Sequence, residues 1–182
     1  MSNTSVKGLI LMGGQSVRMG SDKAFVEYRR QTLLKHCLSQ LEGIPSDVYL
    51  SVNSDQFERL QGDYNCIQDR YPDKGPMGGI LSALETLNVD LIVLAVDMPE
   101  VNHAMLSRLL TKSAKVKAYQ NQENQWEPLP SFWPKTIIET LSKYFSKDQL
   151  SLNGFLKTHG EVVISDDHSD SFKNLNSPSD LI

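Results

Sequence analysis

The segment from residue 8 to residue 24 reads Gly8-Leu9-Ile10-Leu11-Met12-Gly13-Gly14-Gln15-Ser16-Val17-Arg18-Met19-Gly20-Ser21-Asp22-Lys23-Ala24. An apolar run from Val6 to Met12 ends at two glycines, which is typical of a buried parallel strand followed by a sharp turn. Glycines accept positive φ and carry no Cβ, so phosphate oxygens can approach the backbone N–H groups of such a loop. The segment therefore predicts a strand that leads into an anion-binding loop.

The same loop carries two cations. Arg18 can place its guanidinium on two phosphate oxygens, and Lys23 can place a point charge on another. The spacing matches neither G-x-x-x-x-G-K-[ST] nor G-x-G-x-x-G, which excludes a P-loop and a dinucleotide-binding motif. A glycine pair alone indicates an ordinary strand-to-helix turn before a solvated charged loop. The combination of glycines, Arg18 and Lys23 in one loop favours a polyphosphate site.

Length and composition restrict the class of protein. The chain has 182 residues, of which 40% are hydrophobic and 22% charged, as expected for one globular domain. No apolar run approaches the length of a membrane span, and the N-terminus lacks the features of a signal peptide, so we expect a cytoplasmic protein that does not bind membranes. A net charge of −4 gives no support for binding nucleic acid.

Cysteine and histidine positions indicate no metal or redox chemistry. The two cysteines, Cys37 and Cys66, lack metal-ligand or redox spacing and are interpreted as buried thiols. The histidines show no metal-ligand spacing either, and surface positions are expected for all four: His36, His103, His159 and His168.

Helical and strand patterns alternate along the chain. Helices are expected over Leu33–Leu41, after a cap at Thr32, and over Met77–Leu87, with further helices after residues 103, 134, 151 and 177. Strands are expected at 6–12, 48–52, 66–67, 91–96, 116–119, 126–133 and 161–164. The two prolines within 126–133 restrict that strand to an edge or an irregular return segment. The pattern predicts an α/β fold: a single-domain, Rossmann-like three-layer sandwich with a mostly parallel sheet.

Three further segments carry candidate chemistry: Gly75-Pro76-Met77-Gly78-Gly79, Asp97-Met98-Pro99 and Phe172-Lys173-Asn174-Leu175-Asn176-Ser177-Pro178. Taken alone, each has a plain structural explanation, as a helix start, a turn or cap, and two turn-forming asparagines before a cap. Asp97, however, directly follows the most continuously apolar strand, at the carboxyl end where open α/β sheets bind ligands. That position favours a metal ligand facing the phosphate loop.

The N-terminal segment closely resembles the signature L-x-G-G-x-S-x-R-M-G-x-D-K-A of the molybdenum cofactor guanylyltransferases, which are nucleotidyltransferases with a nucleoside-diphosphate-sugar-pyrophosphorylase-like fold. Met12 departs from the alanine usual in that family. The three later segments resemble the family's G-P-x-x-G, D-x-P and F-x-N-x-N-T-P elements in the same order, with Ser177 in place of threonine. The resemblance covers most of the chain and implies one nucleotidyltransferase domain over residues 1–182, with a nucleotide-binding N-terminal part and an acceptor-binding C-terminal part.

The resemblance also implies an activity: transfer of GMP from GTP to Mo-molybdopterin, with Mg²⁺ as cofactor and with molybdoenzyme maturation proteins as possible partners. It assigns catalytic roles to Arg18, Lys23 and Asp97, and metal binding to Asp97. It assigns acceptor binding to Asn174 and Asn176, and a less uniform segment, Glu127-Pro128-Leu129, to the acceptor pocket. Nucleotide binding is implied for the following residues: Leu11, Met12, Gly13, Gly14, Lys23, Asn53, Asp69, Gly75, Pro76 and Asp97.

Other functions stay open on the sequence. A cytidylyltransferase or a sugar-1-phosphate nucleotidyltransferase has the same expected fold, and base identity depends on a few loop residues. A catalytically silent nucleotide-binding or cofactor-carrier module is a third possibility, against which the intact Lys23 and Asp97 argue.

Overall fold

The computed structural model describes residues 6–13, 22–111, 113–164, 172 and 174–175. Its centre is a seven-stranded sheet made of β1 (Lys7–Leu11), β4 (Val48–Val52), β5 (Cys66–Gln68), β6 (Leu91–Ala95), β7 (Val116–Gln120), β8 (Trp126–Trp133) and β9 (Gly160–Ile164). The spatial order is β5-β4-β1-β6-β8-β7-β9. Only β8 runs antiparallel to its neighbours, which confirms a mostly parallel sheet.

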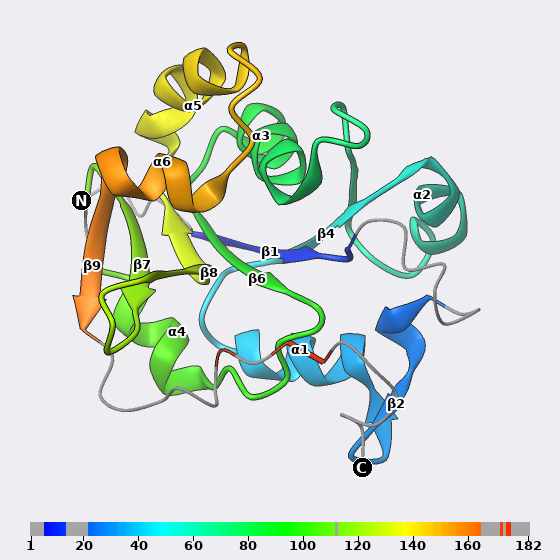
Figure 1. Cartoon of the computed structure of the whole chain (residues 1–182). Helices are drawn as coiled ribbons and strands as arrows, with labels where there is room; N and C mark the ends of the chain where they lie inside the picture. Colours follow the sequence, from blue (N-terminus) through cyan, green and yellow to red (C-terminus); the bar gives the residue numbers. More distant parts are fainter. Residues whose placement is uncertain (1–5, 14–21, 112, 165–171, 173, 176–182) are drawn as a thin grey trace.

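Helices cover both faces of this sheet (Figure 1). One face carries α1 (Leu33–Leu41) and α4 (His103–Leu109), and the other carries α3 (Gly75–Leu87), α5 (Ile138–Phe145) and α6 (Leu152–His159). The short helix α2 (Ser54–Leu60) lies at the end of the sheet formed by β4 and β5, and the 3₁₀ turn η3 (Lys135–Ile137) leads into α5. The predicted three-layer α/β sandwich is therefore confirmed.

Burial of the central strands explains why they are continuously apolar. Leu9 and Ile10 of β1 and all of Leu91 to Leu94 in β6 are 0% exposed. Parallel strands that are covered on both faces need apolar side chains on both. Polar groups of these strands can therefore reach solvent only at the strand ends, where the chain leaves the sheet.

A small hairpin lies between Lys23 and α1. The 3₁₀ turn η2 (Lys23–Phe25) leads into β2 (Glu27–Tyr28), which pairs antiparallel with β3 (Gln31–Thr32). Thr32 then caps α1, as predicted, by accepting a hydrogen bond from the Lys35 N–H at 3.3 Å. The hairpin thus connects Lys23 directly to α1.

Of the two alternatives predicted for residues 126–133, the edge position is wrong, because β8 lies between β6 and β7, and the irregular return segment is confirmed, because β8 runs antiparallel with a shift of register. Its register with β7 shifts: Ser131 lies opposite Ala118, whereas Glu127 lies opposite the next residue, Tyr119. Residues 128–130 pair with neither neighbouring strand. Proline cannot donate a ladder hydrogen bond, and a bulge is the place where an interior strand accommodates it.

The surface position predicted for His36 is also wrong. His36 is 6% exposed on α1, on the same apolar face as Leu33 and Cys37. His103 is exposed and His159 is half-buried, whereas His168 lies outside the described residues. Cys37 is buried as predicted, whereas the buried position predicted for Cys66 is wrong, because Cys66 is only half-buried.

The C-terminal part returns to the sheet. Ser151 caps α6 by accepting from the Gly154 N–H at 3.1 Å, as predicted. Phe172 is buried with its ring centroid 5.4 Å from that of Tyr119 on β7. The helix predicted from Ser177 lies outside the described residues. Within the described part of the chain, no helix combines the length and the apolar character that a membrane crossing needs.

A substitution at Gly78 tests the close contact between α3 and the loop that precedes it. A Cβ at Gly78 would lie 2.9 Å from the Tyr71 carbonyl oxygen, so Gly78→Ala forces backbone to move. Helix propensity alone favours alanine by about 1 kcal/mol, whereas overpacking costs about 1–3 kcal/mol. We expect Gly78→Ala to lower the melting temperature by about 2–8 °C in calorimetry. Gly62→Ala is the control, because nothing lies within 4 Å of a Cβ there. An equal or higher melting temperature for Gly78→Ala would contradict this packing.

Candidate functional site

The candidate site lies at the edge of the sheet where four parallel strands end. Leu11 at the end of β1 is in register with Ser51 of β4 and with Ala95 of β6, and Val52 is in register with Gln68 of β5. The residues that follow these strands share one edge in this order: Asp69, Asn53, Gly13 and Asp97. Adjacent strands lie about 4.8 Å apart, so this row spans about 15 Å.

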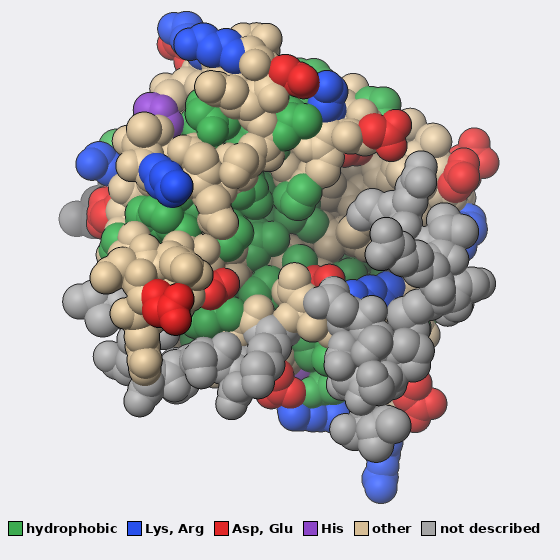
Figure 2. Space-filling model, viewed as in Figure 1, with side chains coloured by type: hydrophobic (Ala, Val, Ile, Leu, Met, Phe, Trp, Pro, Cys, Tyr) green, Lys and Arg blue, Asp and Glu red, His purple; other side chains and the backbone are tan. Residues whose placement is uncertain are grey.

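Figure 2 shows that the molecule is hollowed on this side. Hydrophobic side chains gather near the middle of the face, and acidic and basic side chains lie next to one another at the margin of the hollow. Such a concave apolar surface with a few polar groups at its margin is typical of a small-molecule site.

The turn after β1 brings backbone to the edge of the sheet. Leu11 and Met12 are 6% and 2% exposed, so their side chains belong to the core. The Met12 N–H donates to the Ser51 carbonyl at 3.2 Å, and the Val96 N–H donates to the Leu11 carbonyl at 3.0 Å. Gly13 is exposed with a φ of 86°, the left-handed conformation that glycine accepts most easily. Gly14 and Arg18 lie outside the described residues.

Lys23 and Asp97 form an ion pair at this edge. Lys23 Nζ lies 3.1 Å from Asp97 Oδ2, and the two side chains are only 13% and 23% exposed. Lys23 begins η2, which Asp22 caps by accepting from the Ala24 N–H at 3.3 Å. The fold therefore joins the cation of the N-terminal loop to the carboxylate that follows β6.

Asp22 is held by a network that includes Asn53. Gln56 Nε2 donates to Asp22 Oδ2 at 2.9 Å, and Arg59 lies 3.3 Å from the same oxygen. Gln56 also forms a capping box with Asn53: the Gln56 N–H donates to Asn53 Oδ1 at 2.8 Å, and the Asn53 N–H donates to Gln56 Oε1 at 3.2 Å. The sequence reasoning above missed Gln56, although the spacing Asn53-x-x-Gln56 is a helix-start signal.

Asp69 shapes the loop that leads into α3. Its Oδ1 accepts from the Tyr71 N–H at 2.8 Å and from the Ser82 hydroxyl at 3.0 Å. Gly75 and Pro76 follow in the first turn of α3, where both are exposed and Gly75 has a φ of 63°. The loop that begins at Asp69 is thereby tied to the middle of α3 through Ser82, which is fully buried.

The C-terminal segment reaches the loop that carries Asp97. The Leu175 N–H donates to the Asp97 carbonyl at 2.9 Å, and Phe172 packs on Tyr119. Exposed Asn174 lies between these two contacts in the sequence. The structure thus brings Asn174 to the same edge as Asp97, whereas Asn176 lies outside the described residues.

Glu127 lies at the start of β8, opposite Tyr119. It is half-buried, and burial raises the pKa of its carboxyl group against the opposing effect of Asn121, whose Nδ2 lies 3.5 Å away. Pro128 and Leu129 follow in the bulge. Tyr119 is therefore a shared neighbour of Glu127, which it faces in the ladder, and of Phe172, which packs on its ring.

The donor set at this edge fits a divalent metal that a nucleotide helps to hold. Across the described residues, no group of three or more His, Cys, Asp or Glu side chains is placed to bind a metal. Asp97 offers one carboxylate, and its present partner is the Lys23 ammonium. Metals used in phosphoryl transfer are commonly bound by one or two carboxylates, with substrate phosphates and waters supplying the remaining oxygens.

Comparison with known proteins finds relatives over most of the chain. A family model described as the MobA-like NTP transferase domain matches residues 8–162. A molybdenum cofactor guanylyltransferase from Syntrophotalea carbinolica is 30% identical over 184 residues, covering 95% of this chain and 87% of that protein. One from Pseudomonas putida is 29% identical, covering 95% and 94%.

Solved structures show the same fold. Molybdopterin-guanine dinucleotide biosynthesis protein A from Archaeoglobus fulgidus has a TM-score of 0.80 at 22% identity, covering 97% of this chain and 95% of that chain. A 4-diphosphocytidyl-2C-methyl-D-erythritol synthase from Anaerococcus prevotii has a TM-score of 0.71 at 11% identity, covering 99% and 96%. The fold, the ordered motifs and the family match lead to one conclusion: this chain belongs to the MobA-like NTP transferase family and is related over nearly its whole length to the molybdenum cofactor guanylyltransferases.

Proposed function

We propose that this nucleotidyltransferase transfers GMP from GTP to the phosphate of Mo-molybdopterin and releases pyrophosphate. The observation that carries the proposal is the Lys23–Asp97 pair, which lies at the carboxyl edge of the sheet and is joined to the C-terminal segment by the Leu175–Asp97 hydrogen bond. Phosphate-binding and acceptor-side elements therefore meet at one loop. The names of the full-length relatives give the substrate pair.

The nucleotide is proposed to lie along the row of strand ends. Gly13 and Gly14 provide backbone N–H groups, and Arg18 and Lys23 provide charge for the phosphates. Asn53 and Asp69 lie farther along the row, on the side proposed for the base and ribose. Because their Oδ1 atoms serve the capping box and the loop before α3, these contacts orient both side chains. Gly75 and Pro76 complete this side in the first turn of α3.

Mg²⁺ is the metal proposed for this site, with Asp97 as its protein ligand. Mg²⁺ prefers hard oxygen ligands and is commonly bound through one or two carboxylates plus substrate phosphates. When bound, it would neutralise charge on the phosphates. In its absence Lys23 neutralises the Asp97 carboxylate, so neither charge is left unpaired in a partly buried site.

The reaction needs little acid–base chemistry from the protein. A phosphate monoester has its second ionisation near about pH 6, so the acceptor phosphate is already an anionic nucleophile at neutral pH. One of its oxygens forms a bond to the α-phosphorus of GTP while the bond from that phosphorus to the bridging oxygen breaks, and pyrophosphate leaves. The chain must align the two phosphates and stabilise charge on pyrophosphate with Lys23, Arg18 and loop N–H groups.

The acceptor is proposed to bind on the side of the C-terminal segment. Asn174 and Asn176 are its proposed hydrogen-bonding partners. Glu127 of β8 lies opposite Tyr119 of β7, and Phe172 of the C-terminal segment packs on the Tyr119 ring. Maturation proteins that receive the product are proposed partners as well.

A nucleotide panel tests the proposed substrate. With Mo-molybdopterin and Mg²⁺, we expect GTP to yield pyrophosphate and a guanine dinucleotide identified by mass spectrometry, and GTP to raise the melting temperature more than CTP, UTP or ATP. The fold itself accommodates cytidylyl transfer in related structures, so CTP is the decisive comparison. Equal turnover with GTP and CTP would contradict the guanine assignment, and turnover with a sugar 1-phosphate instead of the pterin would contradict the acceptor.

Substitutions at the ion pair separate phosphate binding from metal binding. Lys23→Ala should lower kcat/KM about 10- to 100-fold with weaker GTP binding, because a charged hydrogen bond to phosphate is lost. Asp97→Asn should lower kcat about 100-fold or more, and added Mg²⁺ should restore part of it. Kinetics at varied GTP and Mg²⁺ measure both effects. Lys143→Ala and Asp63→Asn are exposed controls, and the roles are wrong if the paired variants behave like these controls.

Asn174→Ala tests the acceptor side. Loss of one neutral hydrogen bond costs about 0.5–1.5 kcal/mol, so the KM for the pterin should rise about 2- to 10-fold. GTP binding, measured by calorimetry, should be retained. A loss of GTP affinity with an unaltered pterin KM would place Asn174 on the nucleotide side instead.

A further inference from the structure

His36 is a buried histidine that the chemistry above does not use. Its Nε2 lies 2.8 Å from the Pro99 carbonyl oxygen, which can only accept, so Nε2 carries the proton. Its Nδ1 lies 3.1 Å from Gln31 Nε2, which donates to it. Gln40 Nε2 is farther from His36 Nε2, at 3.4 Å, and does not determine the tautomer. His36 thus fixes a backbone carbonyl two residues after Asp97.

The next residue of α1 holds a carbonyl on the other side of Asp97. Cys37 Sγ donates to the Val96 carbonyl at 3.3 Å. Burial, and then the charge of Asp97, raises the pKa of the Cys37 thiol to about 12, so it stays protonated and keeps this donor. His36 and Cys37 therefore bind carbonyls directly before and shortly after Asp97.

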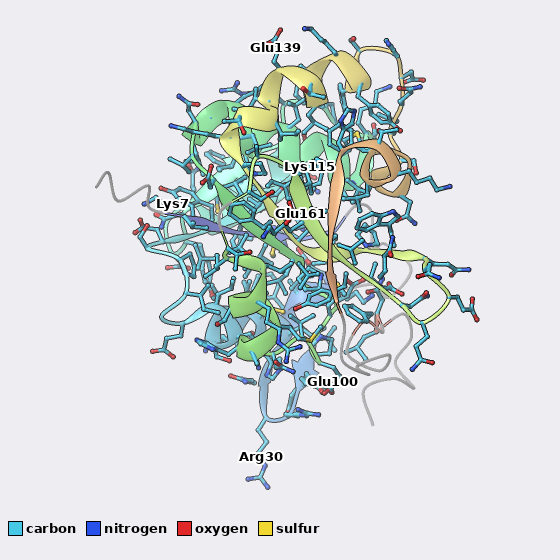
Figure 3. The ribbon with its side chains drawn as sticks, turned by 90° about the vertical axis from the view of Figure 1, so that its left-hand side faces the viewer. Lys7, Arg30, Glu100, Lys115, Glu139 and Glu161 are labelled. Carbon is cyan, nitrogen blue, oxygen red and sulfur yellow. The ribbon has the colours of Figure 1, made fainter. Side chains whose placement is uncertain are left out.

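The hairpin β2–β3 holds the far end of the same loop. The Tyr28 hydroxyl donates to Glu100, and Arg29 lies 2.8 Å from the same carboxylate oxygen. The Tyr28 ring also meets the His36 ring edge-on, with centroids 5.1 Å apart. Figure 3 shows Glu100 beside this hairpin, whereas Arg30 points away from the molecule at the hairpin tip.

The backbone of residues 96–100 is thereby attached to the piece of chain that begins with Lys23. Lys23 is the first residue of η2, which continues through the hairpin into α1. The loop that contains Asp97 is hydrogen-bonded to α1 at the Val96 and Pro99 carbonyls. Lys23 and Asp97 are far apart in the sequence, so the distance between their side chains depends on this attachment.

We propose that His36 is a positioning residue that orients Asp97 for metal binding by fixing the Pro99 carbonyl. The proposal rests on the role of Asp97 as the metal ligand stated under Proposed function. Misplacement of a ligand by about 1 Å strongly weakens a site whose other ligands come from the substrate. His36 touches neither metal nor substrate, and it acts through the backbone of the loop.

Three substitutions at His36 separate positioning from bulk. His36→Gln keeps an N–H donor near the place of Nε2, His36→Asn carries a shorter amide that does not reach Pro99, and His36→Leu keeps volume without a donor. Mn²⁺ replaces Mg²⁺ as the probe, and its binding in the presence of GTP is measured by electron paramagnetic resonance. GTP binding without metal is measured by calorimetry, and Arg30→Ala is the control at the hairpin tip.

We expect His36→Asn and His36→Leu to weaken Mn²⁺ binding about tenfold, the scale of lost support around a metal ligand, with metal-free GTP affinity unchanged. His36→Gln should recover most of the affinity. If His36→Leu does not fold, the comparison of His36→Gln with His36→Asn still tests whether the hydrogen bond to Pro99 supports Mn²⁺ binding. The proposal would be overturned if His36→Gln and His36→Asn weakened Mn²⁺ binding equally. It would also be overturned if the variants weakened metal-free GTP binding as much as Mn²⁺ binding.

A combined variant separates this proposal from the proposed function. In an Asp97→Asn background, His36→Asn should have no further effect on Mn²⁺ binding, because the ligand it orients is gone. If Asp97→Asn alone leaves Mn²⁺ binding intact, the assigned metal ligand is wrong. If Asp97→Asn weakens binding and His36→Asn weakens it further by the same factor as in the unaltered protein, the metal ligand stands and the positioning role of His36 is wrong.

Discussion

The parallel pairing of β1 with β4 on one side and β6 on the other is the constraint on which the site depends. Parallel strands end at the same edge, so the turn after β1 and the loop after β6 have to meet there. Because both faces of these strands are covered and apolar, their polar groups can gather only at the strand ends. The pairing brings the turn after β1 and the loop after β6 to one edge, and the contacts of α1 with residues 96–99 then hold Asp97 beside the segment that carries Lys23.

Much of this arrangement can be predicted from the sequence. The continuously apolar runs that end at Gly13 and at Asp97 indicate buried parallel strands, and Thr32 and Ser151 mark helix starts that the structure confirms. These signals are local: they depend on the order of apolar and polar residues over one element. The family resemblance could be stated for the same reason, since each of its motifs is a short run of consecutive residues.

What could not be predicted depends on contacts between distant segments. The prolines of β8 left an edge strand and an irregular return segment open, and the sequence of residues 126–133 could not decide between them. The choice depends on pairing with β6 and β7, in which residues 128–130 stay outside the ladder. His36 was expected on the surface because the four histidines show no metal-ligand spacing and lie in expected helices or polar turns. Its position three residues after Leu33 and directly before Cys37 does match the buried face, so the helical period contained the signal. Its partner, Pro99, could be identified only in the folded chain.

The hydrogen bond from Leu175 to the Asp97 carbonyl has a consequence for how the protein matures. Leu175 follows β9, so a chain that emerges from the ribosome with its N-terminus first can assemble all seven strands before this bond forms. The strand ends that carry Gly13 and Asp97 belong to the sheet itself, whereas Leu175 joins them from outside it. None of the seven strands needs Leu175 for its own pairing, so this hydrogen bond adds the C-terminal segment to an edge that the sheet forms without it.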